Sequence, residues 1–368
     1  MSNLFQPYNL AGTTLANRVV MAPMTRARAL DDIPDEHTVL YYAQRASAGL
    51  IVSEGAPISR EGCGYLFNPG LYNDAQVQGW RRVTEAVHAK GGKMFAQLWH
   101  VGRVSHVSIQ PDGGAPVSSV AVTAARSNAY AWVAEDQPGP VQASMPRALE
   151  ADEVRRVTAD FVSAARRAMD AGFDGVELHG ANGYLFEQFH NGALNTRTDE
   201  YGGSLVNRAR ILVDIVAAVR NVIGNRLALG VRLCGDEFID GGTTIDEAVE
   251  VAKIVEATGQ VDYINTSIGV ATASLFMIEA SMHIPPGYAM FIPAAIRKAV
   301  DLPVVGVGRF KDPLQAERAL AEGQCDLVGI VRGQIADADF AIKARAGATD
   351  EIRFGDNDTL AALVANLV

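Results

Sequence analysis

The chain has 368 residues, of which 48% are hydrophobic and 20% are charged, and its formal net charge is −10. This composition is ordinary for a globular protein and excludes disorder as the dominant state. The acidic balance and the lack of a long basic run argue against a nucleic-acid-binding protein or one that binds an anionic membrane surface.

Eight short apolar segments predict buried strands, at 18–22, 49–53, 93–98, 175–179, 227–233, 261–265, 303–306 and 326–330. Amphipathic segments precede six of them and predict helices at 74–89, 151–171, 205–223, 244–257, 291–300 and 313–321. Apolar strands that alternate with helices are typical of a parallel sheet covered by helices. The first strand is followed by PMTR instead of a glycine-rich turn. Together with the eight units, this favours a closed (β/α)8 TIM barrel over a doubly wound sheet.

The segment 100–147 interrupts this rhythm, because it is rich in Ser, Pro and Gly and shows no clear helical pattern. We interpret it as an elaborated loop after the third strand, on the catalytic face of the barrel. Since no linker or repeat is apparent, we predict a single domain over residues 1–368, with an atypical tail at 349–368.

The three cysteines, Cys63, Cys234 and Cys325, form no Cys-x-x-Cys pair, and the histidines are scattered. A disulfide framework, an iron–sulfur cluster and a metal site are therefore not predicted. The first residues lack the basic and apolar stretches of a signal peptide, and no apolar run is long enough to span a membrane. We expect a cytoplasmic protein without membrane contact.

Polar residues stand at the predicted carboxyl ends of the strands, where barrel enzymes place their chemistry. The Gln97 amide offers donors and acceptors that suit a planar ring with a urea-like edge. A buried Arg232 is costly unless it meets an anion or a ring that becomes anionic, such as a reduced flavin. Arg309 and Arg332 stand at the usual phosphate position of barrel enzymes.

The segment after the fourth strand carries two hydrogen-bond donors, His179 and Asn182, and the phenol of Tyr184. Two donors can polarise a carbonyl or nitro oxygen, and a phenol can supply a proton. Taken alone, His179 is more often a hydrogen-bonded turn residue, and Trp99 and Tyr184 are more often packing residues. Their common placement at one end of the strands favours a site.

Long strings in the chain resemble the Old Yellow Enzyme family of flavin-dependent ene-reductases. They are NRVVMAPMTR (17–26), YYAQRASAGLIVSEG (41–55), AVHAKGGKMFAQLWHVGRVSH (86–106), HGANGYLFEQF (179–189) and NTRTDEYGGSLVNRARIL (195–212). The resemblance implies an FMN-binding (β/α)8 barrel that uses NADPH or NADH to reduce activated alkenes: enones, enals, maleimides and nitroalkenes. The partners implied are those small molecules, in a monomer or homo-oligomer.

The resemblance also implies roles for individual residues. The FMN contacts would be Pro23, Met24, Thr25, Ala56, Gln97, Arg232, Gly308, Arg309, Val331 and Arg332. His179 and Asn182 would bind the substrate oxygen, Tyr184 would protonate the α-carbon, and Trp99 and Thr25 would line the substrate pocket.

From Arg232 onward the chain resembles a second branch, the longer 2,4-dienoyl-CoA-reductase-like enzymes, through RLCGDEFIDGG, VVGVGRFKDP and VRGQIADADF. Val331 stands where many relatives have Gly. We therefore add the hypothesis of a mosaic chain, natural or engineered. The alternatives to an ene-reductase are a 2,4-dienoyl-CoA-type reductase and a flavin-binding barrel with little activity.

Overall fold

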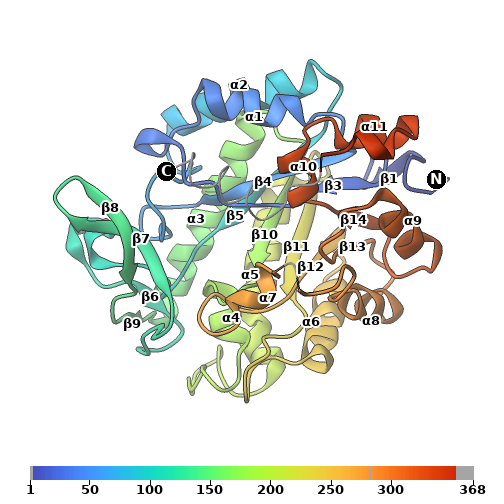
Figure 1. Ribbon diagram of the computed structural model, residues 1–368. Helices are drawn as coiled ribbons and strands as arrows, with labels where there is room; N and C mark the ends of the chain where they lie inside the picture. The colour runs from blue at the N-terminus through green and yellow to red at the C-terminus, as the bar shows by residue number, and fades with distance from the viewer. Residues whose placement is uncertain (1–2, 282, 354–368) are drawn as a thin grey trace.

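Eight parallel strands form a closed barrel in the computed structural model, which describes residues 3–281 and 283–353 (Figure 1). Around the barrel the strands are β3 (Val19–Met21), β4 (Leu50–Pro57), β5 (Met94–Trp99), β10 (Gly175–Gly180), β11 (Ala228–Cys234), β12 (Tyr263–Ser267), β13 (Val304–Val307) and β14 (Leu327–Gly329). All eight predicted strands are present, and the predicted (β/α)8 fold is confirmed.

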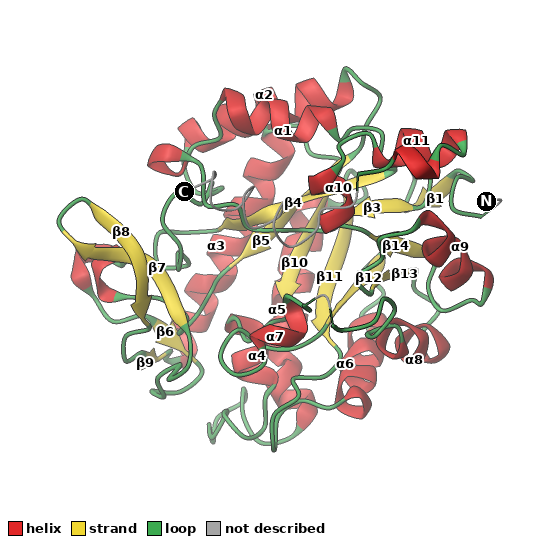
Figure 2. Ribbon diagram, viewed as in Figure 1, coloured by secondary structure: helices red, strands yellow, loops and turns green. Residues whose placement is uncertain are grey.

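Helices surround the strands (Figure 2). The six predicted ones are α2 (Asp74–His88), α3 (Ala151–Asp170), α5 (Leu205–Ile223), α6 (Ile245–Ala257), α8 (Phe291–Ala299) and α9 (Pro313–Ala321). Helices that were not predicted are α1 (Glu36–Gln44), α4 (Leu185–His190), α7 (Leu275–Ile278), α10 (Arg332–Ala336) and α11 (Phe340–Ala346). All of these except α1 have seven residues or fewer, so their apolar periodicity gives little signal. In α1, only Thr38, Tyr42 and Ala43 are buried, so its apolar face is narrow.

The helix α3 shows why these segments fold as they do. Its start is fixed by a capping box, in which the Glu150 backbone N–H donates to the Glu153 carboxyl at 2.9 Å. Its buried residues, among them Val157, Phe161 and Ala168, recur at helical spacing and face the barrel. Burying a side chain such as Phe161 stabilises the fold by about 1.5–3 kcal/mol.

A hairpin of β1 (Tyr8–Leu10) and β2 (Thr13–Leu15) precedes the barrel and was not predicted. Its Leu10 and Leu15 are fully buried in one cluster with Val20, Leu50 and Phe95, from the starts of the barrel strands. The hairpin therefore closes the amino end of the barrel, and the carboxyl end is the one left for a site.

The loop after β5 is elaborated as predicted, and it also contains short strands: β6 (Val117–Ser118), β7 (Asn128–Ala134), β8 (Gln137–Gln142) and β9 (Arg147–Ala148). β7 and β8 form an antiparallel hairpin that stands beside the barrel, opposite α8 and α9 (Figure 1). Tyr130 of β7 holds the segment after β4 through two backbone hydrogen bonds, to Leu66 at 2.8 Å and Gly64 at 3.1 Å. Most of the predicted tail, 354–368, lies outside the described residues. Within the described part of the chain, no helix is long and apolar enough to cross a membrane.

Candidate active site

A buried carboxyl group organises the interior of the barrel near its carboxyl end. Glu177 of β10 is fully buried and accepts hydrogen bonds from Gln97 Nε2 at 2.8 Å, Tyr263 Oη at 2.8 Å and Asn265 Nδ2 at 3.0 Å. We call these four residues the Glu177 network. Because a carboxylate only accepts, the Gln97 amide must turn its NH2 group to Glu177 and its oxygen Oε1 away. Gln97 is thus held ready to accept a hydrogen bond.

The guanidinium of Arg232 is buried near Glu177, and not all of its N–H groups have a hydrogen-bond acceptor. One of its terminal nitrogens donates to Ser267 Oγ at 3.1 Å, while Nε has no hydrogen-bond partner among the described residues. Burial lowers the pKa of Arg232, and the nearby Glu177 opposes that shift. A buried N–H without an acceptor is unfavourable, so this group suits a ligand with an anionic edge.

Four rings pack together at the carboxyl ends of β5 and β10, and we call them the ring cluster: Tyr65, Trp99, His179 and Tyr184. Trp99 is stacked between Tyr65 and His179, with ring centroids 5.5 and 5.7 Å apart. Tyr184 meets Trp99 and His179 edge-on, at 4.7 and 5.1 Å, and its hydroxyl lies 3.2 Å from that of Tyr65. Of the residues predicted for this region, Trp99, His179 and Tyr184 are thereby brought into direct contact; Asn182 is not part of the cluster.

The ring cluster combines a neutral donor with a protonated phenol. Burial and the nearby Arg232 hold the pKa of His179 well below its usual value, so the imidazole is uncharged at neutral pH. Its Nδ1 is buried without a partner in the described chain. Burial and Tyr65 raise the pKa of Tyr184 well above 10, so its hydroxyl keeps its proton. The ring cluster can therefore bind a substrate oxygen at His179 and give a proton to a substrate carbon from Tyr184.

The side chain of Asn182 is turned toward the end of β12. Its Nδ2 donates to Ser267 Oγ at 2.9 Å and lies 3.0 Å from the carbonyl oxygen of Gly269. Ser267 Oγ also receives the Arg232 bond, so it links the two side chains. Asn182 therefore stands beside the site, but its N–H groups are engaged by the protein.

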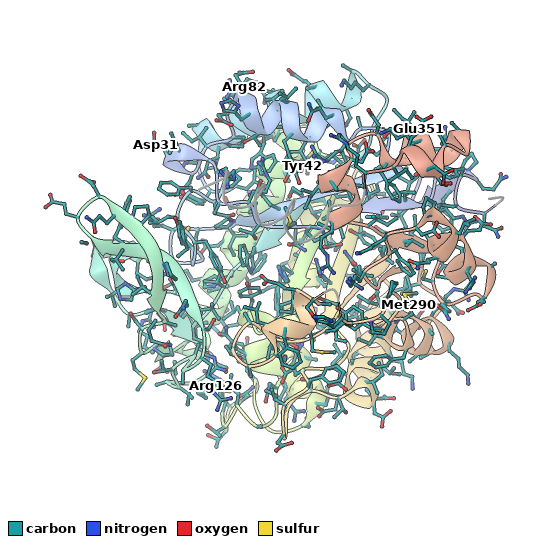
Figure 3. All side chains as sticks on the ribbon, in the orientation of Figure 1. Asp31, Tyr42, Arg82, Arg126, Met290 and Glu351 are labelled. Atoms are coloured by element: carbon teal, nitrogen blue, oxygen red, sulfur yellow. The ribbon has the colours of Figure 1, made fainter. Side chains whose placement is uncertain are left out.

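The predicted contacts at the first strand, Pro23, Met24 and Thr25, lie just past β3, the first two half-buried and Thr25 exposed. The next residue, Arg26, forms a buried ion pair with Glu54 at 2.7 Å. Tyr42 of α1, labelled in Figure 3, donates to the same carboxyl group at 3.2 Å. Separating a buried ion pair costs free energy because it leaves an unpaired charge inside the protein, so this ion pair fixes the path of the loop.

Ala56 is fully buried on β4, where it pairs with Leu98 of β5. At its neighbour Gly55, a Cβ atom would lie 2.5 Å from the ring of Trp99. Glycine at this position therefore allows Trp99 to lie flat against β4, which places the ring cluster next to Ala56.

The predicted phosphate residues follow β13 and β14, and their surroundings are cationic. Burial, Arg309 and Arg332 together lower the pKa of Lys311, and burial and Arg309 lower that of Arg332. These three residues, the cationic group, are thus close enough to repel one another, which favours binding of an anion such as phosphate. Arg332 also donates to the carbonyl of Ala280 at 2.6 Å and Arg309 to that of Ile284. Gly308 and Val331 directly precede the two arginines.

Several residues of this site were missed by the sequence analysis: Tyr65, Glu177, Asn265, Ser267 and Lys311. Asn265 and Ser267 follow the same rule as the residues that were found, since they lie at the carboxyl end of the sixth strand. Tyr65 lies in the loop after β4, where no local pattern distinguishes it. In the described ranges, no group of three or more His, Cys, Asp or Glu side chains is arranged to hold a metal ion.

These features suit a barrel enzyme that holds a phosphorylated ring with an anionic edge: a fixed amide acceptor, a buried guanidinium and a cationic group at the carboxyl ends of the strands. Residues 3–351 match the model of the NADH:flavin oxidoreductase / NADH oxidase family, and the chain belongs to that family. A curated relative, putative 12-oxophytodienoate reductase 4 of Oryza sativa subsp. japonica, is 38% identical over 93% of this chain and 86% of its own length.

Solved structures agree with this assignment. Morphinone reductase in complex with tetrahydroNAD is 38% identical, with a TM-score of 0.83 over 98% of this chain and 94% of that one. An Old Yellow Enzyme homologue from Zymomonas mobilis is 34% identical, with a TM-score of 0.83 over 97% and 96%. The Old Yellow Enzyme resemblance is confirmed, as is the class: an FMN-dependent NAD(P)H oxidoreductase acting on C=C bonds. The mosaic origin stays a hypothesis.

Proposed function

We propose that this ene-reductase reduces enones, enals, maleimides and nitroalkenes at the ring cluster, over an FMN held by the Glu177 network and the cationic group. The observation that carries the proposal is the pairing of an unpartnered, neutral His179 with the proton-bearing phenol of Tyr184. Polarising an oxygen and protonating a carbon are the two tasks that reduction of an activated alkene requires of the protein.

The residues present fit FMN chemically. Gln97 Oε1 and the free Nε of Arg232 would meet the pyrimidine edge, with Ala56 nearby, and the stretch Pro23–Thr25 would lie along the ring. Gly308, Arg309, Val331 and Arg332 would hold the phosphate, together with Lys311. Bound FMN supplies a hydride that it has taken from NADPH or NADH.

The protein's own residues then act on the substrate. His179 donates an N–H to the carbonyl or nitro oxygen, which draws electron density from the β-carbon. Asn182 can add a second donor if it releases its bond to Ser267 or to Gly269. The β-carbon accepts the hydride, and Tyr184 gives its hydroxyl proton to the α-carbon. Trp99 and Thr25 would confine the substrate over the ring.

A visible absorption spectrum recorded before and after anaerobic addition of NADPH tests this function. We expect a flavin spectrum that bleaches with NADPH and returns on addition of cyclohexenone. A protein that neither carries nor takes up FMN would contradict the proposal, and one that is bleached but not reoxidised by cyclohexenone would favour a flavin-binding barrel. A cytoplasmic location stays a prediction. The three cysteines of the protein are free and buried.

A further inference from the structure

Two acidic side chains are buried against each other directly behind the active-site turn. Glu187 of α4 and Glu237 of the segment after β11 are 2% and 1% exposed. Their carboxyl groups are within hydrogen-bonding reach of one another. We call them the acid pair. Nothing in the reaction described above uses it, yet burying two carboxyl groups together is costly unless they share a proton.

The hydrogen bonds around the acid pair indicate where that proton lies. Glu187 Oε2 accepts from the backbone N–H of Gly183 at 2.5 Å, while its Oε1 has no partner among the described residues. Glu237 Oε2 accepts from Asn191 Nδ2 at 2.5 Å and from the Thr243 N–H at 3.1 Å. Glu237 is therefore arranged as the acceptor and Glu187 as the donor. A proton on Glu187 that is shared with Glu237 satisfies both groups.

A small cavity beside the acid pair is a second, independent sign of polar chemistry. Its volume is about 10 Å³, near the room that a single water molecule requires. Glu187, His190 and Thr243 line it. Glu187 Oε1, His190 Nε2 and Thr243 Oγ1 are all buried without a partner in the described chain. One water molecule in this cavity would find several hydrogen-bonding groups.

Other titratable groups lie beside the acid pair: Cys234 of β11, His190 of α4 and Arg103 after β5. The ion pair of Arg208 from α5 with Glu247 from α6 acts on His190. Burial and Arg208 lower the pKa of His190 to about 4, and burial raises that of Cys234, so both are neutral at pH 7. Arg103 is the cation that favours a charge on Glu237. The surroundings therefore support one negative charge and not two.

The acid pair is connected to the reacting groups through one peptide unit. Asn182 and Gly183 both have positive φ, 63° and 81°, in the turn that precedes Tyr184. For a residue other than glycine, this conformation costs on the order of 1–3 kcal/mol and must be held by its surroundings. The Glu187 carboxyl group accepts from the N–H of Gly183, and Gln188 Nε2 donates to the carbonyl oxygen of Gly183 at 2.9 Å.

We propose that Glu187, in the protonated form that it shares with Glu237, is a positioning residue for alkene reduction, because it fixes the turn that carries Asn182 and Tyr184. The proposal rests on the proposed function. A displacement of about 1 Å in a reacting group can cost about 100-fold in rate, so a loosened turn has a measurable effect.

The pH dependence has a definite sign. Burial and the neighbouring acid raise the pKa of Glu187 well above 4.5, and burial raises that of Glu237 to about 7. The folded state thus binds more protons than the unfolded state above pH 4.5, so the free energy of unfolding falls as the pH rises through this interval. At alkaline pH, loss of the shared proton sets two carboxylates against each other and weakens the turn.

Three variants test this proposal in the FMN-loaded enzyme. Glu187→Gln imitates the protonated acid, since its oxygen can accept from Gly183 and its NH2 can donate to Glu237. Glu187→Leu removes both bonds. Glu250→Gln, at an exposed ion pair of α6 with Lys253, is the matched control. The readouts are the rate at which cyclohexenone reoxidises the reduced flavin, measured against pH, and the infrared band of a protonated carboxyl group.

At pH 7 we expect Glu187→Gln to stay within about tenfold of the parent rate, and Glu187→Leu to lose about 100-fold. The infrared band should be present in the parent and in Glu250→Gln and absent from Glu187→Gln. In the parent, the band and the rate should fall together at alkaline pH. Thermal unfolding of each variant establishes that it is folded.

Two results would overturn the proposal: a Glu187→Leu enzyme as fast as Glu187→Gln, or an infrared band unaffected by Glu187→Gln. Failure of the proposed function is distinguishable, because a protein that cannot bind FMN or be reoxidised by cyclohexenone would still show the band if the acid pair shares a proton.

Discussion

Two neighbouring levels of the barrel interior differ in how completely their polar groups are bonded. Gln97 and Glu177 lie at one level and pair in register on β5 and β10; Trp99 and His179 follow two residues later on the same strands. At the lower level the Glu177 carboxyl group receives three hydrogen bonds. At the upper level Trp99 Nε1 and His179 Nδ1 are buried without a partner in the described chain.

The difference indicates a division of work between the two levels. The Glu177 carboxyl group finds its three donors within the protein, so it can fix the orientation of Gln97 without help from a ligand. The ring cluster leaves the buried nitrogens Trp99 Nε1 and His179 Nδ1 unpaired at a free-energy cost, which is typical of positions where a ligand supplies the missing partner. Substitutions at the lower level should therefore affect stability first, and those at the upper level should affect chemistry first.

The largest effect is expected at the upper level, from Tyr184→Phe. Removal of the hydroxyl deletes the proton donor but keeps the ring contacts with Trp99 and His179, so the rate of enone reduction should fall about 100- to 10,000-fold. Reduction of the flavin by NADPH should be nearly unchanged. Stopped-flow measurement of the two half-reactions checks this. Equal losses in the two half-reactions would show that Tyr184 is not the proton donor. Tyr201→Phe, at another buried tyrosine, serves as the control.

At the lower level, Glu177→Leu should destabilise the fold by about 3–5 kcal/mol, because it leaves three buried donors and the nearby Arg232 without their acceptor. Glu177→Gln keeps one acceptor oxygen and should cost less. Chemical denaturation of the two variants and the parent measures the difference. If Glu177→Leu were as stable as the parent, the network would not be the support that its hydrogen bonds indicate.

The sequence predicted the lower and upper levels unequally, for a physical reason. Gln97, His179 and Arg232 were found because apolar periodicity locates the strands, and a strand's carboxyl end locates its functional residues. Glu177 was missed because a carboxyl group inside an apolar strand is recognisable only with its partners Tyr263 and Asn265, which come from another strand. The direction of the Asn182 amide likewise depends on Ser267, which is distant in sequence.

A smaller effect is expected from the double variant His179→Ala with Asn182→Ala, on the affinity for phenols, which imitate a polarised substrate oxygen. Because His179 Nδ1 is unpartnered while the Asn182 amide is already bonded to β12, His179→Ala alone should account for most of the loss, about 10-fold to 100-fold. Titration of the oxidised enzyme with a phenol, followed by its absorption spectrum, measures each single variant and the double one. An equal loss from Asn182→Ala alone would show that its amide leaves β12 when a ligand binds, and unchanged affinity in the double variant would contradict the role of both residues. Unchanged affinity would mean that the two levels differ only in their hydrogen bonds and that the unpaired atoms of the upper level do not bind the substrate oxygen.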